Sequence, residues 1–267
     1  MKKEKGIVCL SFDDGRGDNR CIAEKILLPM SIPATFNITT GYIDGSCSPA
    51  DRPSIKKPMT IDDVRWLAEH SIFEIAMHGD EHKNTLEDIM KCRNKLATWL
   101  SLKNDDTLGF ASPGTGLNIK AMSEKEKNTL FANTTYIRLS LRLKRFATLR
   151  VVSRKLARIF HIPMLYKFAY SDTMLDTHDT KMLYSVPVLK TTTPQEIRRM
   201  VTASKTSGKA VILMFHSICE GTRNDDNWTW EQQRFINICR FIDEEREKGN
   251  IDILTVSDLY KHFNHAE

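Results

Sequence analysis

The sequence of 267 residues lacks the features that mark several classes of protein. No apolar run approaches the roughly 20 residues that a membrane-spanning helix needs, so the sequence predicts no transmembrane segment. The six cysteines are scattered and include no C-x-x-C pair, so we expect reduced, mostly buried thiols rather than a disulfide scaffold. No internal repeat or low-complexity linker divides the chain, which favours a single domain over residues 1–267.

The N-terminal sequence MKKEKGIVCLSFDDG lacks the pattern of a secretory signal peptide. Its apolar stretch is short, runs directly into two carboxylates and is followed by no small-residue cleavage site. We therefore interpret this stretch as a first strand and expect a cytoplasmic protein.

The chain has an ordinary globular composition, with 41% hydrophobic and 27% charged residues, arranged in an alternating β–α order. The predicted strands lie at 6–12, 34–40, 72–78, 107–114, 184–190, 210–216 and 251–256. The connections between them are long enough for crossovers and carry helix-capping patterns. This order predicts an α/β protein with mostly parallel strands, in a sheet that is open or closed into a barrel.

The segment 137–170 breaks this alternation and contains no acidic residue. Large apolar residues separate its nine basic residues, which are Arg138, Arg142, Lys144, Arg145, Arg150, Arg154, Lys155, Arg158 and Lys167. We predict an insertion that is helical in part. It suits peripheral association with an anionic membrane, and a solvated helical face is the alternative. Nucleic-acid binding is not predicted, because aromatic residues are few and the net charge is only +5.

Polar clusters follow four of the predicted strands. The clusters are Asp13 and Asp14, His78 and His82, Ser112–Gly116, and His216. Parallel α/β folds gather their active sites at the carboxyl ends of strands, so we expect the four clusters to converge on one face.

His78 and His82 are candidate metal ligands. Their spacing of four would place both imidazoles on one face of a helical turn. With Asp14 as a third ligand they would form a site of two histidines and one carboxylate, with an open position for water. A surface histidine pair without a metal is the alternative.

Asp13 and His216 are candidates for acid–base work beside that metal. Strand geometry sends neighbouring side chains in different directions, so Asp14 could bind the metal while Asp13 acts as general base on a water. His216 could protonate a leaving amine. The alternatives are a D-D-G turn and a buried histidine at a strand end.

Four further residues are candidates for binding the substrate. The loop SPGTG, with Pro113 and Gly114 at its centre, offers backbone N–H groups to a developing oxyanion, or is an ordinary turn. Trp228 and Trp230 could stack on a sugar ring, or could cap the core.

Taken together, these motifs resemble the polysaccharide deacetylase family, also called the NodB-homology or carbohydrate esterase 4 group. SFDDG at 11–15 resembles the family's T-F-D-D-G motif, and HGDEH at 78–82 resembles its H-[ST]-x-x-H motif. PATFNITTG at 33–41 resembles a characteristic second strand, and ILMFH at 212–216 resembles the late L-x-x-x-H motif.

The resemblance implies a distorted (β/α) barrel and one bound divalent metal, usually Zn²⁺, with Co²⁺, Mn²⁺ and Ni²⁺ as alternatives. It implies removal of an N-acyl group, most simply N-acetyl, from an amino sugar in a polysaccharide, glycolipid or sugar precursor. By matching positions, Asp13 is the base, His216 is the acid, and Asp14, His78 and His82 are the ligands.

The third family motif differs in this chain. FASPG at 110–114 stands where the family has a pattern close to F-R-P-P-Y. Ala111 therefore replaces the arginine that orients the base, and Gly114 replaces a tyrosine whose backbone N–H faces the oxyanion. The D-x-x-D-W motif is not visible. We hypothesise that Arg16 substitutes for the arginine.

Two other functions compete with this interpretation. HGDEH also fits the H-x-x-E-H pattern of a zinc protease with Glu81 as base, which requires the motif to lie in an amphipathic helix. The altered third motif also allows a sugar-binding protein of the same fold with little catalytic activity.

Overall fold

The computed structural model describes residues 5–49, 57–103, 105–141, 152–153, 155–156, 159–160, 163–175, 181–220 and 226–264. The strands of the main sheet are β1 (Gly6–Phe12), β2 (Ala34–Ile38), β3 (Phe73–Met77), β4 (Leu108–Ala111), β5 (Thr134–Ser140), β6 (Met182–Pro187), β7 (Ala210–Phe215) and β10 (Ile251–Ile253). A separate pair is formed by β8 (Ser217–Cys219) and β9 (Thr229–Glu231). The α-helices are α1 (Gly17–Ile22), α2 (Thr40–Asp44), α3 (Ile61–Ala68), α4 (Leu86–Leu100), α5 (Glu124–Asn133), α7 (Pro163–Ala169), α8 (Pro194–Ser207), α9 (Gln232–Glu247) and α10 (Val256–Asn264).

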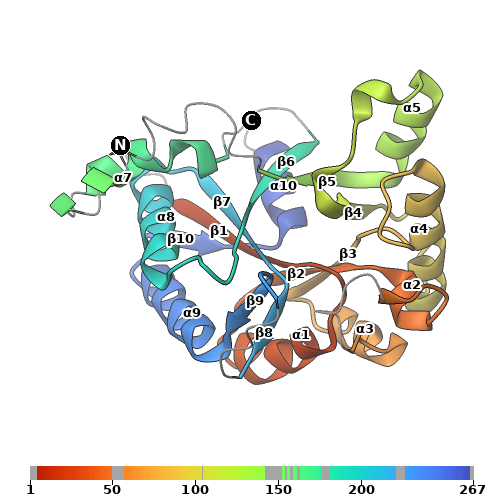
Figure 1. Cartoon of the computed structure of the whole chain (residues 1–267), viewed down its shortest axis with the longest axis horizontal. Coiled ribbons are helices and arrows are strands. Elements are labelled where there is room, and N and C mark those ends of the chain that lie inside the picture. The colour runs from red at the N-terminus through yellow and green to blue at the C-terminus, as the bar shows by residue number, and fades with distance from the viewer. Residues whose placement is uncertain are drawn as a thin grey trace.

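Strands β1 to β7 form a closed, parallel barrel with helices around it (Figure 1). Each strand pairs with the next in the sequence, and β7 closes the ring by pairing with β1 over Ile7–Phe12. Strand β10 pairs in parallel with the first residues of β1, and β2 pairs with its last residues. The predicted α/β barrel is therefore confirmed.

Helix starts in this chain follow from local capping. Thr60, Ser123 and Thr193 precede α3, α5 and α8, and each forms a reciprocal capping box with an acidic residue three positions later. Helix α8 ends at Gly208, whose φ of 73° is the left-handed conformation that glycine adopts without strain.

The amino-terminal part of the barrel interior is mainly apolar, apart from Glu74, whose carboxylate accepts hydrogen bonds from Thr35 and Tyr136. Ile7 and Cys9 of β1 form a buried cluster there with Tyr136 of β5 and with Val256 and Leu259 of α10. Because α10 contacts both β1 and β5, it covers the amino-terminal end of the barrel. The alternate residues of β1, which are Val8, Leu10 and Phe12, belong to the larger core between the barrel and its helices.

The interior becomes polar toward the carboxyl ends of the strands. Asn37 Nδ2 donates to Ser11 Oγ at 2.8 Å, and Arg138 Nη1 donates to Ser185 Oγ at 2.6 Å. All four residues are buried. The barrel thus places a water-poor polar layer at the edge where the predicted site lies.

The predicted insertion at 137–170 is wrong at its start. Residues 137–140 belong to β5, and Arg138 is a buried barrel residue rather than part of a basic surface. Helix α7 confirms that the segment is partly helical. The remaining positions, which are 142–151, 154, 157–158 and 161–162, lie outside the described residues.

Within the described ranges, no helix combines the length and the apolar character needed to cross a bilayer.

Candidate metal centre

Asp13 and Asp14 occupy a tight turn that leaves the barrel wall. Strand β1 ends at Phe12, while Asp14 and Gly15 have φ angles of 75° and 66°. The predicted reason for their different orientations, strand alternation, is therefore wrong. The left-handed turn separates the two carboxylates.

One oxygen of Asp14 is bound and the other is not. Oδ2 accepts hydrogen bonds from Arg16 Nε at 3.1 Å and from Arg16 Nη2 at 2.8 Å. Oδ1 is buried and has no hydrogen-bond partner among the described residues. It lies 3.2 Å from His82 Nε2 and 3.5 Å from His78 Nε2.

The two histidines follow β3 in a loop, not in the predicted helical turn. Gly79 and His82 have φ angles of 80° and 60°, which no helix contains. The loop nevertheless brings the His78 and His82 rings together, with centroids 4.8 Å apart. The zinc-protease interpretation loses its helix here, and Glu81 instead pairs with Lys83 and Lys91.

Asp88 at the start of α4 holds this loop in place. Its carboxylate accepts hydrogen bonds from the backbone N–H groups of Asp80, Glu81 and Lys83 at 2.8–3.0 Å. A Cβ at Gly79 would collide with the same carboxylate, so the loop needs glycine at that position. The sequence indicated Asp88 only as a helix-capping residue three positions after Thr85, and not as the anchor of the histidine loop.

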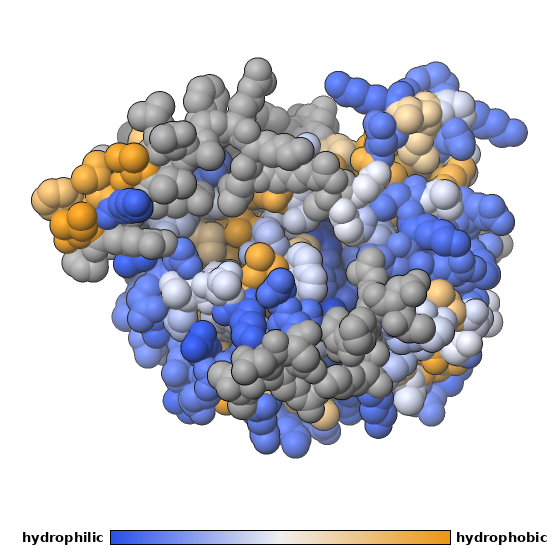
Figure 2. Space-filling model, viewed as in Figure 1, coloured by the Kyte–Doolittle hydropathy of each residue, from blue (hydrophilic) through white to orange (hydrophobic). Residues whose placement is uncertain are grey.

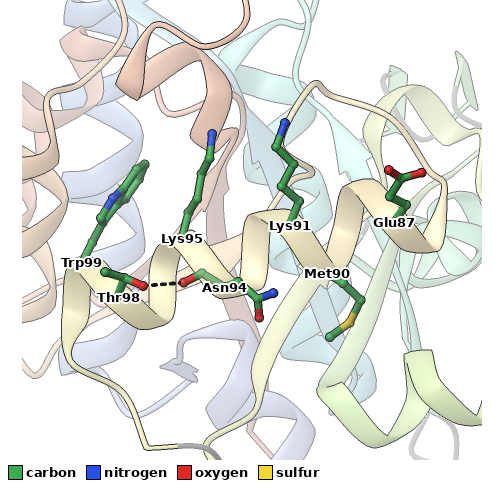
Figure 3. A pocket seen from close by; sticks show the side chains of 7 residues that line it. All are labelled: Glu87, Met90, Lys91, Asn94, Lys95, Thr98 and Trp99. Atoms are coloured by element: carbon green, nitrogen blue, oxygen red, sulfur yellow. Dashed lines mark hydrogen bonds between the residues drawn. The ribbon is translucent and has the colours of Figure 1, made fainter.

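Buried Asp80 ties the loop to the side of α4. Lys91 and Lys95 approach its carboxylate at 2.6 and 2.7 Å, and Thr40 Oγ1 donates to it at 2.7 Å. Figure 3 shows Lys91 and Lys95 pointing in the same direction from one side of α4. Both lysines line a hollow of about 570 Å³. The hollow is lined by Glu87, Met90, Lys91, Asn94, Lys95, Thr98 and Trp99. Lys91 and Lys95 hold the histidine loop through Asp80, and none of the lining residues is a candidate metal ligand.

Asp14, His78 and His82 fit a divalent metal ion. One ligand atom from each lies within 4.8 Å of the others. His78 Nδ1 lies 2.8 Å from the carbonyl oxygen of Ala111, which can only accept, so Nδ1 carries the hydrogen and Nε2 has the free lone pair. Burial raises the pKa of Asp14, but the two histidines and the Arg16 guanidinium hold it well below its usual value. An ionised, half-bound carboxylate beside two imidazoles is the donor set of such a site.

Asp13 lies beside these ligands and is held by two other side chains. Arg138 Nη2 lies 2.7 Å from each Asp13 oxygen, and Asn37 Nδ2 donates to Oδ1 at 2.7 Å. Burial raises the pKa of Asp13, but Arg138, His78 and His216 outweigh it and leave the pKa below its ordinary value. The hypothesis that Arg16 orients Asp13 is wrong, because Arg16 binds Asp14 and Arg138 binds Asp13.

His216 follows β7, about 200 residues after Asp13 and Asp14, but lies near both of them in space. Burial lowers its pKa to about 4, although the charges of Asp14 and Asp13 raise it. Its Nδ1 is buried and finds no hydrogen-bond partner in the described part of the chain. The ring of Trp228 lies against it, with centroids 4.3 Å apart.

The two predicted tryptophans have different environments. Trp228 is 37% exposed beside His216, so it remains a candidate for sugar stacking. Trp230 is 2% exposed, donates from Nε1 to the Thr192 carbonyl at 2.9 Å and packs on Phe215. The prediction for Trp230 is therefore wrong, because it is a core residue.

The loop after β4 is tied to the histidine loop. Asn84 Nδ2 donates to the Pro113 carbonyl at 2.8 Å, and Ser112 Oγ donates to Asn84 Oδ1 at 2.7 Å. Gly114 is exposed with a φ of 56°. These bonds tie the loop that carries Pro113 and Gly114 to the loop that carries His82, while the oxyanion role stays a prediction.

Comparison by sequence finds no relative, whereas comparison by structure does. No family model matches the chain, and no curated protein matches it in sequence. A candidate polysaccharide deacetylase from Mycobacterium smegmatis matches with a TM-score of 0.54 and 12% identity, over 99% of this chain and 92% of that one. A family 4 acetyl xylan esterase from Clostridium thermocellum, in complex with cobalt, has a TM-score of 0.50 and 12% identity, over 96% and 90% of the two chains.

A third solved structure has similar values. The Bc1960 peptidoglycan N-acetylglucosamine deacetylase matches with a TM-score of 0.50 and 12% identity, over 97% of this chain and 90% of that one. Over nearly its whole length, then, this chain has the fold of the carbohydrate esterase 4 polysaccharide deacetylases.

Proposed function

We propose that this protein is a metal-dependent hydrolase that removes an N-acyl group, most simply N-acetyl, from an amino sugar. The observation that carries the proposal is the buried meeting of Asp14, His78 and His82, with Oδ1 of Asp14 turned toward both imidazoles. The fold supports it, because two of its structural neighbours are described as an acetyl xylan esterase and an N-acetylglucosamine deacetylase.

The chemistry is metal-assisted amide hydrolysis. Asp14, His78 and His82 would hold a divalent cation, which would supply Lewis-acid catalysis when bound. Asp13 takes a proton from the attacking water. His216 gives a proton to the departing amine, and the backbone N–H of Gly114 faces the carbonyl oxygen as negative charge develops on it. Trp228 is the side chain offered to the sugar ring.

The low pKa of His216 places a condition on this mechanism. At neutral pH buried His216 is uncharged in the free protein, since its pKa is about 4. It must therefore gain its proton while substrate is bound, and the attacking water is the source. Asp13 accepts that proton first and must then pass it to His216; having done so, Asp13 is charged again, and its charge raises the pKa of His216.

The experiment that tests the function is acetate release from a panel of N-acetylated amino sugars, both oligomeric and nucleotide-linked. The protein is loaded with Zn²⁺, and in parallel with Co²⁺, Mn²⁺ and Ni²⁺. We expect turnover by the wild type and its loss in Asp13→Asn, which should still bind one equivalent of metal. A zinc-loaded wild type that releases no acetate from any member would contradict the proposal and favour a sugar-binding protein.

Glu81→Gln is the matched control in the same loop. Glu81 lies between the two histidines in sequence, but its carboxylate is partly exposed and pairs with Lys83 at 2.5 Å. We therefore assign it to a surface ion pair and not to the metal site. The variant should keep both metal content and acetate release. Loss of all hydrolytic activity in Glu81→Gln would instead support the zinc-protease interpretation.

We further propose that the protein works at the cytoplasmic face of an anionic membrane. Large apolar side chains are exposed at Val152, Leu156, Ile159, Phe160 and Phe168, three of them by more than half. Figure 2 shows hydrophobic side chains gathered at the left edge, near the place of α7 in Figure 1. The surrounding sequence after β5, residues 141–170, has no acidic residue, so its composition favours lipid with negative head groups. The substrate would then be a lipid-linked sugar or a sugar precursor.

Vesicle sedimentation tests the membrane proposal. The wild type should sediment with vesicles that contain phosphatidylserine, and about 1 M salt, where the Debye length falls to about 3 Å, should weaken this binding. Replacing Ile159→Glu and Phe160→Glu together should abolish sedimentation without changing acetate release. Equal sedimentation of the variant, or no sedimentation of the wild type at low salt, would contradict the proposal.

A further inference from the structure

Arg138 is the one arginine of β5, and it is buried inside the barrel at 1% exposure. Its guanidinium joins two strands, because Nη1 donates to Ser185 Oγ of β6 at 2.6 Å and Nη2 lies 2.7 Å from both oxygens of Asp13. Ser185 Oγ in turn donates to the carbonyl of Leu139 at 3.2 Å. The guanidinium is thus fixed at both ends, and it fixes the carboxylate.

The neighbouring strand is built to make room for it. Ala111 of β4 is the register partner of Arg138, so the two side chains point to the same side of the sheet. Two residues earlier, a Cβ at Gly109 of β4 would collide with the ring of Tyr136 of β5. The interior positions of β4 are therefore small where those of β5 are large, an alternation that fills a narrow barrel.

We infer that Arg138 is the positioning residue for Asp13, and that the small side chain of Ala111 is its necessary counterpart. This inference rests on the proposed function, in which Asp13 is the base. Arg138 touches neither substrate nor metal in this assignment. It sets the direction of the carboxylate, and Asn37 supplies the second contact from β2.

The pairing of Ala111 with Arg138 yields a swap experiment. Adjacent strands are about 4.8 Å apart, which an arginine side chain spans, so a guanidinium introduced at position 111 can reach Asp13 when position 138 is emptied. The test pair is Ala111→Arg with Arg138→Ala. The matched control is Ala111→Met with Arg138→Ala, which fills the same space without a guanidinium. The single variant Arg138→Met measures how much kcat is lost when the guanidinium is removed.

The expected result has three parts. Arg138→Met should keep one equivalent of zinc and a nearly unchanged KM, while kcat falls by about 10²-fold because the base is misplaced. The Ala111→Arg, Arg138→Ala pair should recover at least a tenth of the lost rate, and the methionine control should recover none. A structural role alone would not separate the two pairs, because both fill the barrel.

Two outcomes would overturn the inference: equal kcat in the two pairs when both fold and bind zinc, or a swapped pair that does not fold. If the wild type released no acetate from any acylated sugar, that result would instead refute the proposed function. In that case a crystal structure of the swapped pair still decides the placement, since the introduced guanidinium should lie within hydrogen-bond distance of Asp13.

Discussion

Two candidate ligands, Asp14 and His82, have left-handed backbone conformations although neither is glycine. For an L-residue this costs about 1–2 kcal/mol, and such strain persists only where the surrounding structure fixes it. Here the fixing contacts are Arg16 on Asp14 and the carboxylate of Asp88 under the histidine loop. Backbone strain at Asp14 and His82 is expected if both side chains must reach the same metal ion.

Arg16 should therefore control metal affinity through Asp14. It binds Oδ2 with two nitrogens and is itself anchored by Ser217 Oγ at 2.9 Å and by Asp226 at 3.2 Å. We predict that Arg16→Lys weakens zinc binding by about 10–100-fold, as loss of a partner behind a ligand usually does. Competition with a chromophoric chelator measures this, and Arg20→Lys, at an arginine of α1 that pairs with Glu24 rather than with Asp14, is the control. Unchanged affinity in Arg16→Lys would show that Asp14 needs no such support.

His216 should make the metal-free protein sensitive to acid. Its pKa is about 4 in the folded protein because burial disfavours the charged ring, and 6.5 is the ordinary value. Between these values the unfolded chain binds a proton that the folded chain does not, so stability falls as the pH falls through this window. Asp18, whose pKa burial raises to about 6, acts in the opposite direction.

Urea denaturation of the metal-free wild type and of His216→Gln isolates this contribution, because that of Asp18 is common to both. From pH 7 to about pH 4.5 the wild type should lose about 2–3 kcal/mol more unfolding free energy than the variant. Parallel losses in the two proteins would show that His216 is solvated rather than buried.

At the scale of elements, the loop between β3 and α4 is the unit that makes the ligand pair. Removing its anchor with Asp88→Ala would leave the N–H groups of Asp80, Glu81 and Lys83 without their shared acceptor. We predict a fall in zinc affinity of about 10-fold or more and a lower melting temperature, since buried unpaired donors cost about 1–3 kcal/mol each. Calorimetry with and without zinc measures both effects. Glu87→Ala, the exposed neighbour on α4, should change neither.

The same loop shows what local patterns can and cannot predict. The spacing of His78 and His82 correctly indicated that the rings meet, but the predicted helical turn was wrong. Glycine at position 79 and a carboxylate at position 88 stabilise a loop that no helical period describes. The metal candidates were predictable because their chemistry is visible in residue type, whereas their geometry depends on contacts from another element.

Strand β5 is the element that sequence reasoning missed. Its sequence TTYIRLS carries an arginine at a position that looks like the start of a basic surface segment. Only the closed barrel turns Tyr136 and Arg138 inward, where Asp13 neutralises the guanidinium. The arginine that pairs with Asp13 could therefore not be predicted from the sequence, because it lies on a different strand and far along the chain.

At the scale of the whole molecule, barrel closure brings together Asp13 and His216, the proposed base and acid. The pairing of β1 with β7 runs to Phe12 and Phe215, and the next residues along the two strands are Asp13 and His216. Asp13 N donates to the Phe215 carbonyl at 2.9 Å, so the ladder continues into the site. The two groups that would move protons are adjacent because the first and the seventh strands complete the ring.

Phe12 stabilises the pairing of β1 with β7, here called the seam, from the helix-covered outer face of the barrel. Its ring stacks on Phe36 at 5.2 Å and on Phe215 at 5.6 Å between centroids, and Phe235 of α9 meets it edge-on at 5.8 Å. We predict that Phe12→Ala lowers the free energy of unfolding by about 3–5 kcal/mol, because the cavity cannot collapse among three rigid rings. Denaturant titration measures this loss, and Phe12→Leu should lose less.

The same variant separates the packing of the seam from the chemistry of the site. The hydrogen bonds that position Asp14, His78 and their loop come from Arg16, Ala111 and Asp88, and Phe12 takes part in none of these bonds. Phe12→Ala should therefore still bind one equivalent of zinc under native conditions, while its turnover falls because Asp13 and His216 lose their fixed separation. Loss of zinc in folded Phe12→Ala would show instead that the seam holds the ligands as well.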